Sequence, residues 1–346
     1  MSAEGNPVEE TVLVTGGSGF LGGWCVRLLL DRGYRVRATV RNEKRTDGVR
    51  RAVAGELADP DRLEFAVADL GAEAGWADAV AGCSRVLHVA SPFPDRQPRD
   101  HDELIVPARD GALRVIRAAL DAGAERVVMT SSTASIRNGD DDTHPGPYSE
   151  TEWTDPDRPG LSAYPRSKTI AELAAWDLAE ERGARDRLVT VCPSAILGPV
   201  QGDEMSFSLQ LIQRMLKGMP GVPNLGFGFV DVRDVADMHV RAMTVPAAGG
   251  ERFIASGPFY WLTEISKILR EQMPEEAAKA PTRTVPKPVL RAMGLFDPGI
   301  RSIIGDLGLE SHYDVSKADR VLDWRARPIE ETVVDCARSL IERGRA

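Results

Sequence analysis

The chain has 346 residues, of which 42% are hydrophobic and 27% are charged, which is enough apolar material for a packed core and excludes a disordered chain. A net charge of −9 with interspersed signs gives no indication of a nucleic-acid partner. The first ten residues are polar and acidic, unlike a secretion signal, and no long apolar run suits a membrane span, so we expect a cytoplasmic protein. The four cysteines and five histidines do not cluster, so we expect no disulfide framework and no metal site.

A glycine-rich turn follows the first expected strand, at residues 12–15. Three glycines fit the pattern G-x-x-G-x-x-G, and two apolar residues between them open a helix: Gly16, Gly19, Gly22, Phe20 and Leu21. Backbone amides in such a turn can approach a pyrophosphate, and the helix N-terminus adds the positive end of a dipole. The alternative is that the glycines serve only the close packing of the strand against the helix. The strand before them, the helix after them and a second strand at 35–40 favour dinucleotide binding at these five residues.

Basic residues follow the second strand. Arg41 closes it, 19 residues after Gly22, where a carboxylate would hold both ribose hydroxyls of NAD. Arg41 and Lys44 suit a 2′-phosphate instead, because a guanidinium offers a fork of donors to phosphate oxygens. The sequence therefore predicts NADP(H) as the cofactor. The alternative is that these basic residues form an ordinary solvated surface cluster with no role in cofactor binding.

The third and fourth strands end in further candidates for cofactor contact. Asp69 and Leu70 follow the third strand, where the carboxylate could bond the adenine amino group or simply cap a turn. His88 lies within the fourth strand and is interpreted as a packed core histidine rather than a catalytic base. Ala90 and Ser91 reach the carboxyl edge, where we expect their backbone to line the cofactor.

The fifth strand runs out through Ser131 and Ser132, and about 30 residues later Tyr164 and Lys168 open an apolar helix. Tyrosine and lysine at i and i+4 share one helix face. A nearby ammonium favours the ionised form of a phenol, which makes the tyrosine a usable acid or base. A tyrosine and a lysine four residues apart often occur by chance. A glycine turn, a strand-end serine and this pair, in this order along the chain, indicate a catalytic site.

Strand-like and helix-like runs alternate up to about residue 200. The expected strands lie at 12–15, 36–40, 63–67, 85–89, 126–130 and 188–192, and the expected helices at about 20–32, 48–57, 73–81, 101–122 and 161–182. Such alternation predicts an α/β fold, a Rossmann-type doubly wound parallel sheet that binds ligands at the carboxyl ends of its strands.

Beyond residue 197 the alternation degrades into glycine- and proline-rich loops with helices expected at about 261–273, 287–294 and 328–343. We interpret this part as a smaller, mostly helical substrate lobe at the C-terminal side. The expected division is an NADP-binding Rossmann domain at 1–197 and a substrate-binding lobe at 198–346. The two are interleaved, with about 226–256 returning to the Rossmann domain.

From about residue 11 to 245 the chain resembles the extended short-chain dehydrogenase/reductase superfamily, in its dihydroflavonol reductase-like and aldehyde/ketone reductase-like group. The resemblance rests on VTGGSGFLGGW, GYRVRATVR, ADL, VLHVASP, VVMTSS, YPRSKTIAELAAW, CPSAILGP and FVDVRDVADMHVRAM. It implies that Ser132, Tyr164 and Lys168 are catalytic, with Ser132 favoured over Ser131. It also implies that the backbone around Pro193 and Ile196 bonds the nicotinamide carboxamide.

Two positions depart from the family pattern. The helix after the fourth strand lacks the asparagine that many members place there, so the resemblance does not extend to a proton relay through that helix. Arg137 stands where flavonoid-reducing relatives tend to carry an uncharged polar residue, so we name no flavonoid substrate.

These features together predict an NADPH-dependent carbonyl reductase that converts an aldehyde or ketone to an alcohol, reversibly, by hydride transfer with proton donation from a tyrosine. The expected partner is a small-molecule carbonyl substrate, with no nucleic acid or membrane, and the expected state is a monomer or homodimer. A sugar-nucleotide epimerase or dehydratase, a hydroxysteroid dehydrogenase and a non-catalytic NADP(H)-binding sensor remain as alternatives.

Overall fold

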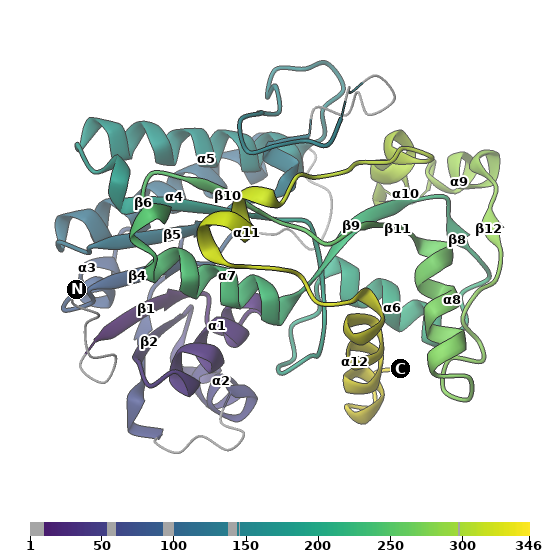
Figure 1. Cartoon of the computed structure of the whole chain (residues 1–346), viewed down its shortest axis with the longest axis horizontal. Coiled ribbons are helices and arrows are strands. Elements are labelled where there is room, and N and C mark those ends of the chain that lie inside the picture. Colours follow the sequence, from purple (N-terminus) through teal and green to yellow (C-terminus); the bar gives the residue numbers. More distant parts are fainter. Residues whose placement is uncertain (1–9, 54–59, 93–99, 138–143, 145, 297) are drawn as a thin grey trace.

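A seven-stranded, all-parallel sheet forms the centre of the computed structural model, which describes residues 10–53, 60–92, 100–137, 144, 146–296 and 298–346 (Figure 1). Its strands, in chain order, are β1 (Thr11–Thr15), β2 (Arg35–Val40), β3 (Leu63–Val67), β4 (Arg85–His88), β5 (Arg126–Thr130), β6 (Leu188–Pro193) and β10 (Arg252–Ala255). The spatial order is β10-β6-β5-β4-β1-β2-β3. The predicted doubly wound fold is confirmed, and the strand order reverses between β1 and β4, where such sheets bind ligands.

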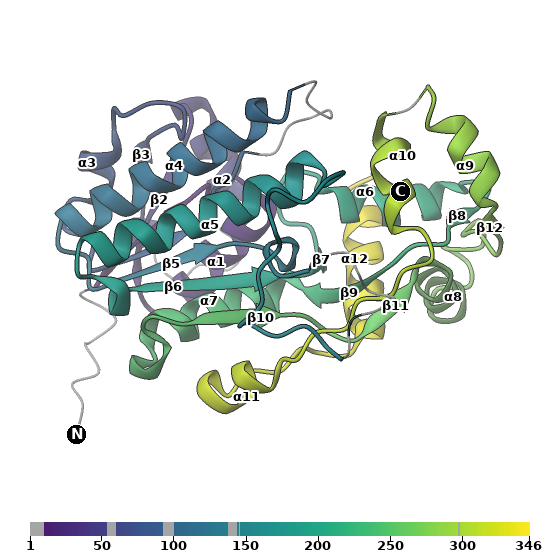
Figure 2. The same ribbon diagram turned by 90° about the horizontal axis from the view of Figure 1, so that it is seen from above.

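Both faces of the sheet are covered, which explains why its strands are nearly continuous apolar runs. Residues 12–14 of β1, for example, have no exposed surface. Three helices pack on one face: α1 (Phe20–Asp31), α2 (Thr46–Val53) and α7 (Val232–Thr244). The other face is covered by α3 (Trp76–Val80), α4 (Asp102–Asp121) and α5 (Ala163–Glu181), of which α4 and α5 lie side by side (Figure 2).

The helix ends differ from the sequence predictions in places with a physical reason. The helix predicted at 73–81 is the shorter α3, because Gly75 precedes it with φ of 88°, a left-handed conformation that cannot continue a helix. The helix predicted at 48–57 starts two residues early as α2, and its predicted end lies outside the described residues. The strand β10 was not singled out in the sequence analysis.

The region after residue 197 builds a second core. Around it lie α6 (Phe207–Lys217), α8 (Leu262–Gln272), α9 (Lys287–Met293), α10 (Pro298–Ile303) and α12 (Ile329–Glu342), and α11 (Ser316–Leu322) packs instead near β10. Two small sheets are also present: β7 (Ala195–Leu197), β9 (Gly226–Asp231) and β11 (Phe259–Trp261) form one, and β8 (Val222–Pro223) and β12 (Thr284–Val285) form the other. We call residues 198–231 and 257–346, apart from α11, the lobe. None of the helices in the described ranges is long and apolar enough to cross a membrane.

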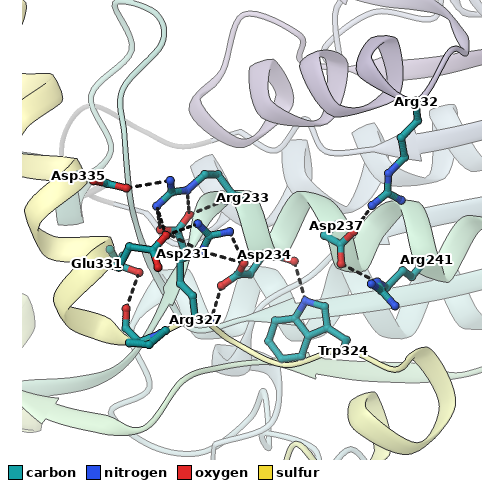
Figure 3. Close-up of polar contacts among 12 residues, drawn as sticks. Arg32, Asp231, Arg233, Asp234, Asp237, Arg241, Trp324, Arg327, Glu331 and Asp335 are labelled. Atoms are coloured by element: carbon teal, nitrogen blue, oxygen red, sulfur yellow. Dashed lines mark hydrogen bonds and ion pairs between the residues drawn. The ribbon is translucent and has the colours of Figure 1, made fainter.

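A network of ion pairs fastens the lobe to the main sheet (Figure 3). Asp231 caps α7 by accepting from the Arg233 backbone N–H at 2.8 Å, and Arg233 also pairs with Asp335 of α12 at 2.9 Å. Arg327 reaches Asp234 of α7 at 2.8 Å. Because Asp231 has no exposed side-chain surface, this network fixes how β9 and α7 meet α12.

Candidate active site

The glycine turn at the end of β1 is closed so tightly that two of its positions require glycine. Gly16 has φ of +70°, and a Cβ on Gly22 would lie 2.1 Å from the Gly16 carbonyl oxygen. The Gly19 N–H donates to the Gly16 carbonyl at 2.9 Å, and α1 starts directly afterwards with Phe20 and Leu21. The turn therefore presents backbone and a helix N-terminus at the carboxyl edge of the sheet.

The ends of β1 and β4 meet beside this turn, at the reversal of strand order. Thr15 lies opposite His88 in register, and its hydroxyl accepts from the Ala90 N–H at 3.0 Å while bonding His88 Nδ1 at 2.9 Å. Burial, with the positive charge of Lys168 as a smaller cause, lowers the pKa of His88 to about 3. His88 is therefore neutral near pH 7 and buried in the core, as the sequence interpretation held.

The basic segment after β2 contains one residue that the sequence analysis did not select. Arg41 and Lys44 are exposed, whereas Arg45 turns back toward the glycine turn. Its Nη1 lies 3.4 Å from Ser18 Oγ and 2.8 Å from Glu204 Oε1. Arg45 ends the 3₁₀ turn η1 (Glu43–Arg45), and the signal for it in the sequence was its place directly after Lys44 in the same basic segment.

The residues that follow β3 make a local turn. The Asp69 carboxylate accepts from the Gly71 N–H at 2.7 Å, which is the turn-capping alternative for this side chain. The Leu70 carbonyl accepts from Arg114 at 2.7 Å, and the Leu70 side chain packs against Gly111 of α4. Asp69 nevertheless remains exposed at the carboxyl edge.

The two serines after β5 face different surroundings. Ser131 donates to the buried carboxylate of Glu172 at 2.5 Å. Ser132 caps the 3₁₀ turn η3 (Thr133–Ser135), its Oγ accepting from the Ala134 N–H at 3.1 Å. Because Ser132 Oγ is the acceptor in that bond, its hydroxyl proton is not used there. The turn η3 packs against α5, the helix that carries Tyr164.

Tyr164 and Lys168 lie on the first turns of α5. Lys168 Nζ donates to Ser91 Oγ at 3.0 Å and lies 6.0 Å from the centre of the Tyr164 ring. Lys168 is 8% exposed, so its ammonium is held close to the sheet edge. The structure thus brings together Tyr164, Lys168 and Ser91, from α5 and the end of β4.

A buried ion pair lies behind these residues, and the sequence analysis missed it. Glu172 has no exposed surface and pairs with Arg252 of β10 at 2.8 Å; it also accepts from Thr190 at 2.7 Å and from Ser135 at 2.6 Å. Burial alone would raise the pKa of Glu172, but Arg252 and the surrounding hydroxyls outweigh it, so the pKa lies below its usual value. The available signal was a glutamate at i+8 from Tyr164 and i+4 from Lys168 on the same helix face.

A small pocket of about 40 Å³ opens next to the turn that follows Ser132, between the sheet edge and the lobe. Thr133, the residue after Ser132, and Ser194, the residue after Pro193, line one side. The Pro193 carbonyl accepts weakly from the Thr133 hydroxyl at 3.4 Å, and the Ile196 carbonyl accepts from Ser208 at 2.6 Å. The segment around Pro193 and Ile196 thus runs past the pocket.

Comparison with known proteins identifies the family of this chain. Residues 12–255 match the NAD dependent epimerase/dehydratase family. The chain is 36% identical over 299 residues to a cinnamoyl-CoA reductase of Medicago truncatula, covering 83% of this chain and 90% of the relative. It is 37% identical over 271 residues to tetraketide alpha-pyrone reductase 2 of Arabidopsis thaliana, covering 76% and 82%.

Among solved structures, the yeast methylglyoxal/isovaleraldehyde reductase Gre2 in complex with NADPH superposes with a TM-score of 0.80 at 26% identity, covering 97% of this chain and all of the other. The family match covers well over half of the chain. The chain therefore belongs to the NAD dependent epimerase/dehydratase family, and within it to the extended, dihydroflavonol reductase-like short-chain dehydrogenases/reductases.

Proposed function

We propose that this chain, an NADP-dependent oxidoreductase acting on CH–OH groups, reduces an aldehyde or ketone to the alcohol with Tyr164 as the proton donor. The observation that carries the proposal is the placement of Lys168 between Tyr164 and Ser91, at the same sheet edge as the glycine turn. The relatives support it, since their names denote reductases and one solved neighbour holds NADPH.

The residues around the glycine turn fit a phosphorylated dinucleotide. The tight Gly16 and Gly22 positions leave no Cβ between the backbone and a pyrophosphate. Arg41, Lys44 and Arg45 supply positive charge beyond β2, where Arg45 faces Ser18. We assign the 2′-phosphate to these cations, the adenine side to Asp69 and Leu70, and the nicotinamide side to Ala90, Ser91, Pro193 and Ile196.

In the proposed mechanism the carbonyl oxygen accepts hydrogen bonds from Ser132 and Tyr164. NADPH, when bound, would supply the hydride for the carbonyl carbon. Tyr164 gives its proton to the carbonyl oxygen, which completes the alcohol. Lys168 would hold a ribose hydroxyl of the cofactor, and its positive charge, 6.0 Å from the centre of the Tyr164 ring, would offset the negative charge left after proton transfer until a proton from solvent replaces it. Ser132 contributes orientation and a hydrogen bond rather than charge.

The test is to mix purified protein with NADPH and to follow the nicotinamide absorbance while aldehydes, α-diketones, β-ketoesters and cyclic ketones are supplied. We expect oxidation of NADPH with at least one class. Tyr164→Phe should lower turnover by about 10² to 10⁴, the usual scale for a lost acid–base group, with NADPH still bound.

The alternatives give different results in the same assay. A sugar-nucleotide epimerase would retain its dinucleotide and consume no added NADPH, and a sensor would bind NADPH without oxidising it. Full activity in Tyr164→Phe would remove the mechanism.

A further inference from the structure

An ion pair joins the lobe to the basic segment after β2. Glu204 lies in the loop between β7 and α6, and its Oε1 lies 2.8 Å from Nη1 of Arg45. The same Nη1 lies 3.4 Å from Ser18 Oγ in the glycine turn. A carboxylate of the lobe therefore occupies a guanidinium that we have assigned to the 2′-phosphate of NADP(H).

The loop that carries this carboxylate is bonded on two sides. We call residues 198–206 the strap. The Pro199 carbonyl accepts from Trp24 Nε1 of α1 at 2.9 Å, and the Asp203 carbonyl accepts from Arg345, which follows α12, at 3.0 Å. The strap is thus fixed to both the main domain and the lobe, which keeps the carboxylate beside the basic segment.

The ion pair itself is open to water. The Arg45 side chain is 39% exposed and that of Glu204 is 47% exposed, and a pair as exposed as this contributes little free energy because water screens both charges. A phosphate monoester carries a charge of about −1.5 to −2 at pH 7 and three acceptor oxygens, against a single charge for a carboxylate. A 2′-phosphate is therefore the stronger partner for Arg45, and it can displace the carboxylate without moving the strap.

Once displaced, the carboxylate is an unfavourable neighbour for the phosphate. The strap keeps it within reach of Arg45, and its charge has the same sign as that of the phosphate. NAD(H) has no phosphate at this position, so its binding leaves the ion pair intact. The carboxylate therefore opposes binding of the phosphorylated dinucleotide and not of the unphosphorylated one.

We propose that Glu204 is a cofactor-specificity residue. It is the counter-ion of Arg45 in the free protein, the 2′-phosphate displaces it, and it thereby lowers the affinity for NADP(H) while leaving the affinity for NAD(H) unchanged. This inference rests on the proposed assignment of the 2′-phosphate to the basic segment after β2. Arg45 attracts the phosphate, and Glu204 limits how tightly the phosphate is held.

The experiment measures dissociation constants by calorimetry, with no carbonyl compound present. The ligands are NADP⁺ and NAD⁺, and also adenosine 2′,5′-bisphosphate and 5′-AMP, which lack the nicotinamide. The variants are Glu204→Gln, Arg45→Gln, the double variant and Asp203→Asn. The last is the matched control, because it removes the neighbouring carboxylate of the strap, which is 96% exposed and pairs with Arg345 instead. The affinity for NAD⁺ reports whether each variant is correctly folded.

We expect Glu204→Gln to tighten the binding of NADP⁺ and of the bisphosphate by about two- to fivefold, the scale of an exposed ion pair, and to leave NAD⁺ and 5′-AMP unchanged. The gain should shrink at high salt, which screens exposed charges. It should also shrink in the Arg45→Gln background, because the carboxylate then has no guanidinium to occupy. Asp203→Asn should change the NADP⁺ affinity by less than Glu204→Gln does.

Three results would overturn the proposal: no gain for NADP⁺ in Glu204→Gln, an equal gain for NAD⁺, or an equal gain in Asp203→Asn. The outcome is separable from a failure of the proposed function. If Arg45→Gln leaves the NADP⁺ affinity unchanged, the assignment of the phosphate to Arg45 is wrong and the proposal falls with it. If Arg45→Gln weakens NADP⁺ binding and Glu204→Gln has no effect, the assignment stands and the role of Glu204 alone is overturned. A failure to reduce carbonyl compounds changes none of these measurements.

Discussion

The two walls of the pocket are built on different supports. Behind Thr133 and Ser194, the parallel strands β5 and β6 end beside α5, and the ion pair of Glu172 and Arg252 is buried under them. Behind Phe227, which lines the lobe side of the pocket, β9 pairs with the three-residue strands β7 and β11 and rests on the lobe core. The main-domain wall is thus held by a deep sheet, while the lobe wall is held by short strands and loops.

We expect this difference to divide catalysis from substrate selection. Residues that must hold a reacting carbonyl within a few tenths of an ångström belong on rigid elements whose neighbours fix them, and the proposed catalytic residues Ser132, Tyr164 and Lys168 lie on the main-domain side. Residues that set the shape of the pocket can sit on elements that tolerate change. Two ion pairs drawn in Figure 3 join the main domain to the lobe: Arg233 of α7 pairs with Asp335 of α12, and Asp234 of α7 pairs with Arg327, which lies just before α12.

The largest expected effect comes from breaking the support behind the main-domain wall. Glu172→Gln should lower the free energy of unfolding by about 3–5 kcal/mol, because Arg252 would keep a buried charge without its carboxylate. Glu180→Gln, at an exposed position of the same helix, should change it by less than about 0.5 kcal/mol. Denaturant titration measures both, and a loss below about 1 kcal/mol for Glu172→Gln would contradict the role given to the pair.

The effect of Glu172→Gln should also depend on pH. The pKa of Glu172 is lowered in the fold, so the stabilisation by its carboxylate is complete above the ordinary value of 4.5 and is lost as the pH falls through the folded-state pKa. The difference between the variant and the unmodified protein should therefore shrink at acidic pH.

The two neighbouring serines provide a sharper comparison within the same wall. Ser132→Ala should lower turnover by about 10² to 10³, the scale for a lost hydrogen-bond donor to the reacting oxygen. Ser131→Ala should leave turnover nearly intact but reduce stability by about 1.5–3 kcal/mol, because it removes a hydrogen bond to the Glu172 carboxylate. Steady-state kinetics and denaturant titration on both variants decide the matter, and the reverse ranking of turnover would show that Ser131 is the catalytic serine.

Cofactor choice should depend on the basic residues that follow β2. Charge-assisted bonds to phosphate are worth about 1.5–3 kcal/mol, so NADPH should be preferred over NADH by about tenfold or more. Arg41→Asp should erase or invert this preference, and Arg45→Gln should weaken it, while the ranking of carbonyl substrates stays the same. The ratio of kcat/KM for the two cofactors is the measurement, and equal efficiency in the unmodified protein would contradict the assignment.

The main-domain wall could be predicted from the sequence because its signals are local. The six strands predicted from apolar runs are all present, and the alternation of strands and helices fixed the sheet type. The glycine spacing around Gly16 and Gly22 reports a turn formed by consecutive residues, so its geometry follows from a short stretch of chain.

Contacts between distant residues could not be predicted in this way. Glu172 and Arg252 are 80 residues apart, and a charged residue in an apolar run indicates burial only once its partner is known. The pair of Arg45 and Glu204 spans 159 residues and joins the main domain to the lobe. The lobe strands are two to six residues long, too short for a periodic pattern, which is why the sequence analysis described this region mainly by its helices.

The smallest expected effect tests the lobe wall. Phe227 lines the pocket, whereas Phe207 is 50% exposed and lies outside it, so the two phenylalanines form a matched pair. Phe227→Ala should change the relative kcat/KM of small and bulky carbonyl substrates by about tenfold, since even one methylene in a pocket is worth about 1–3 kcal/mol. Phe207→Ala should leave the ranking unchanged, and both variants should bind NADPH normally. If Phe227→Ala instead weakens NADPH binding and leaves the ranking intact, the lobe wall serves the cofactor, and the separation between chemistry and selection is wrong.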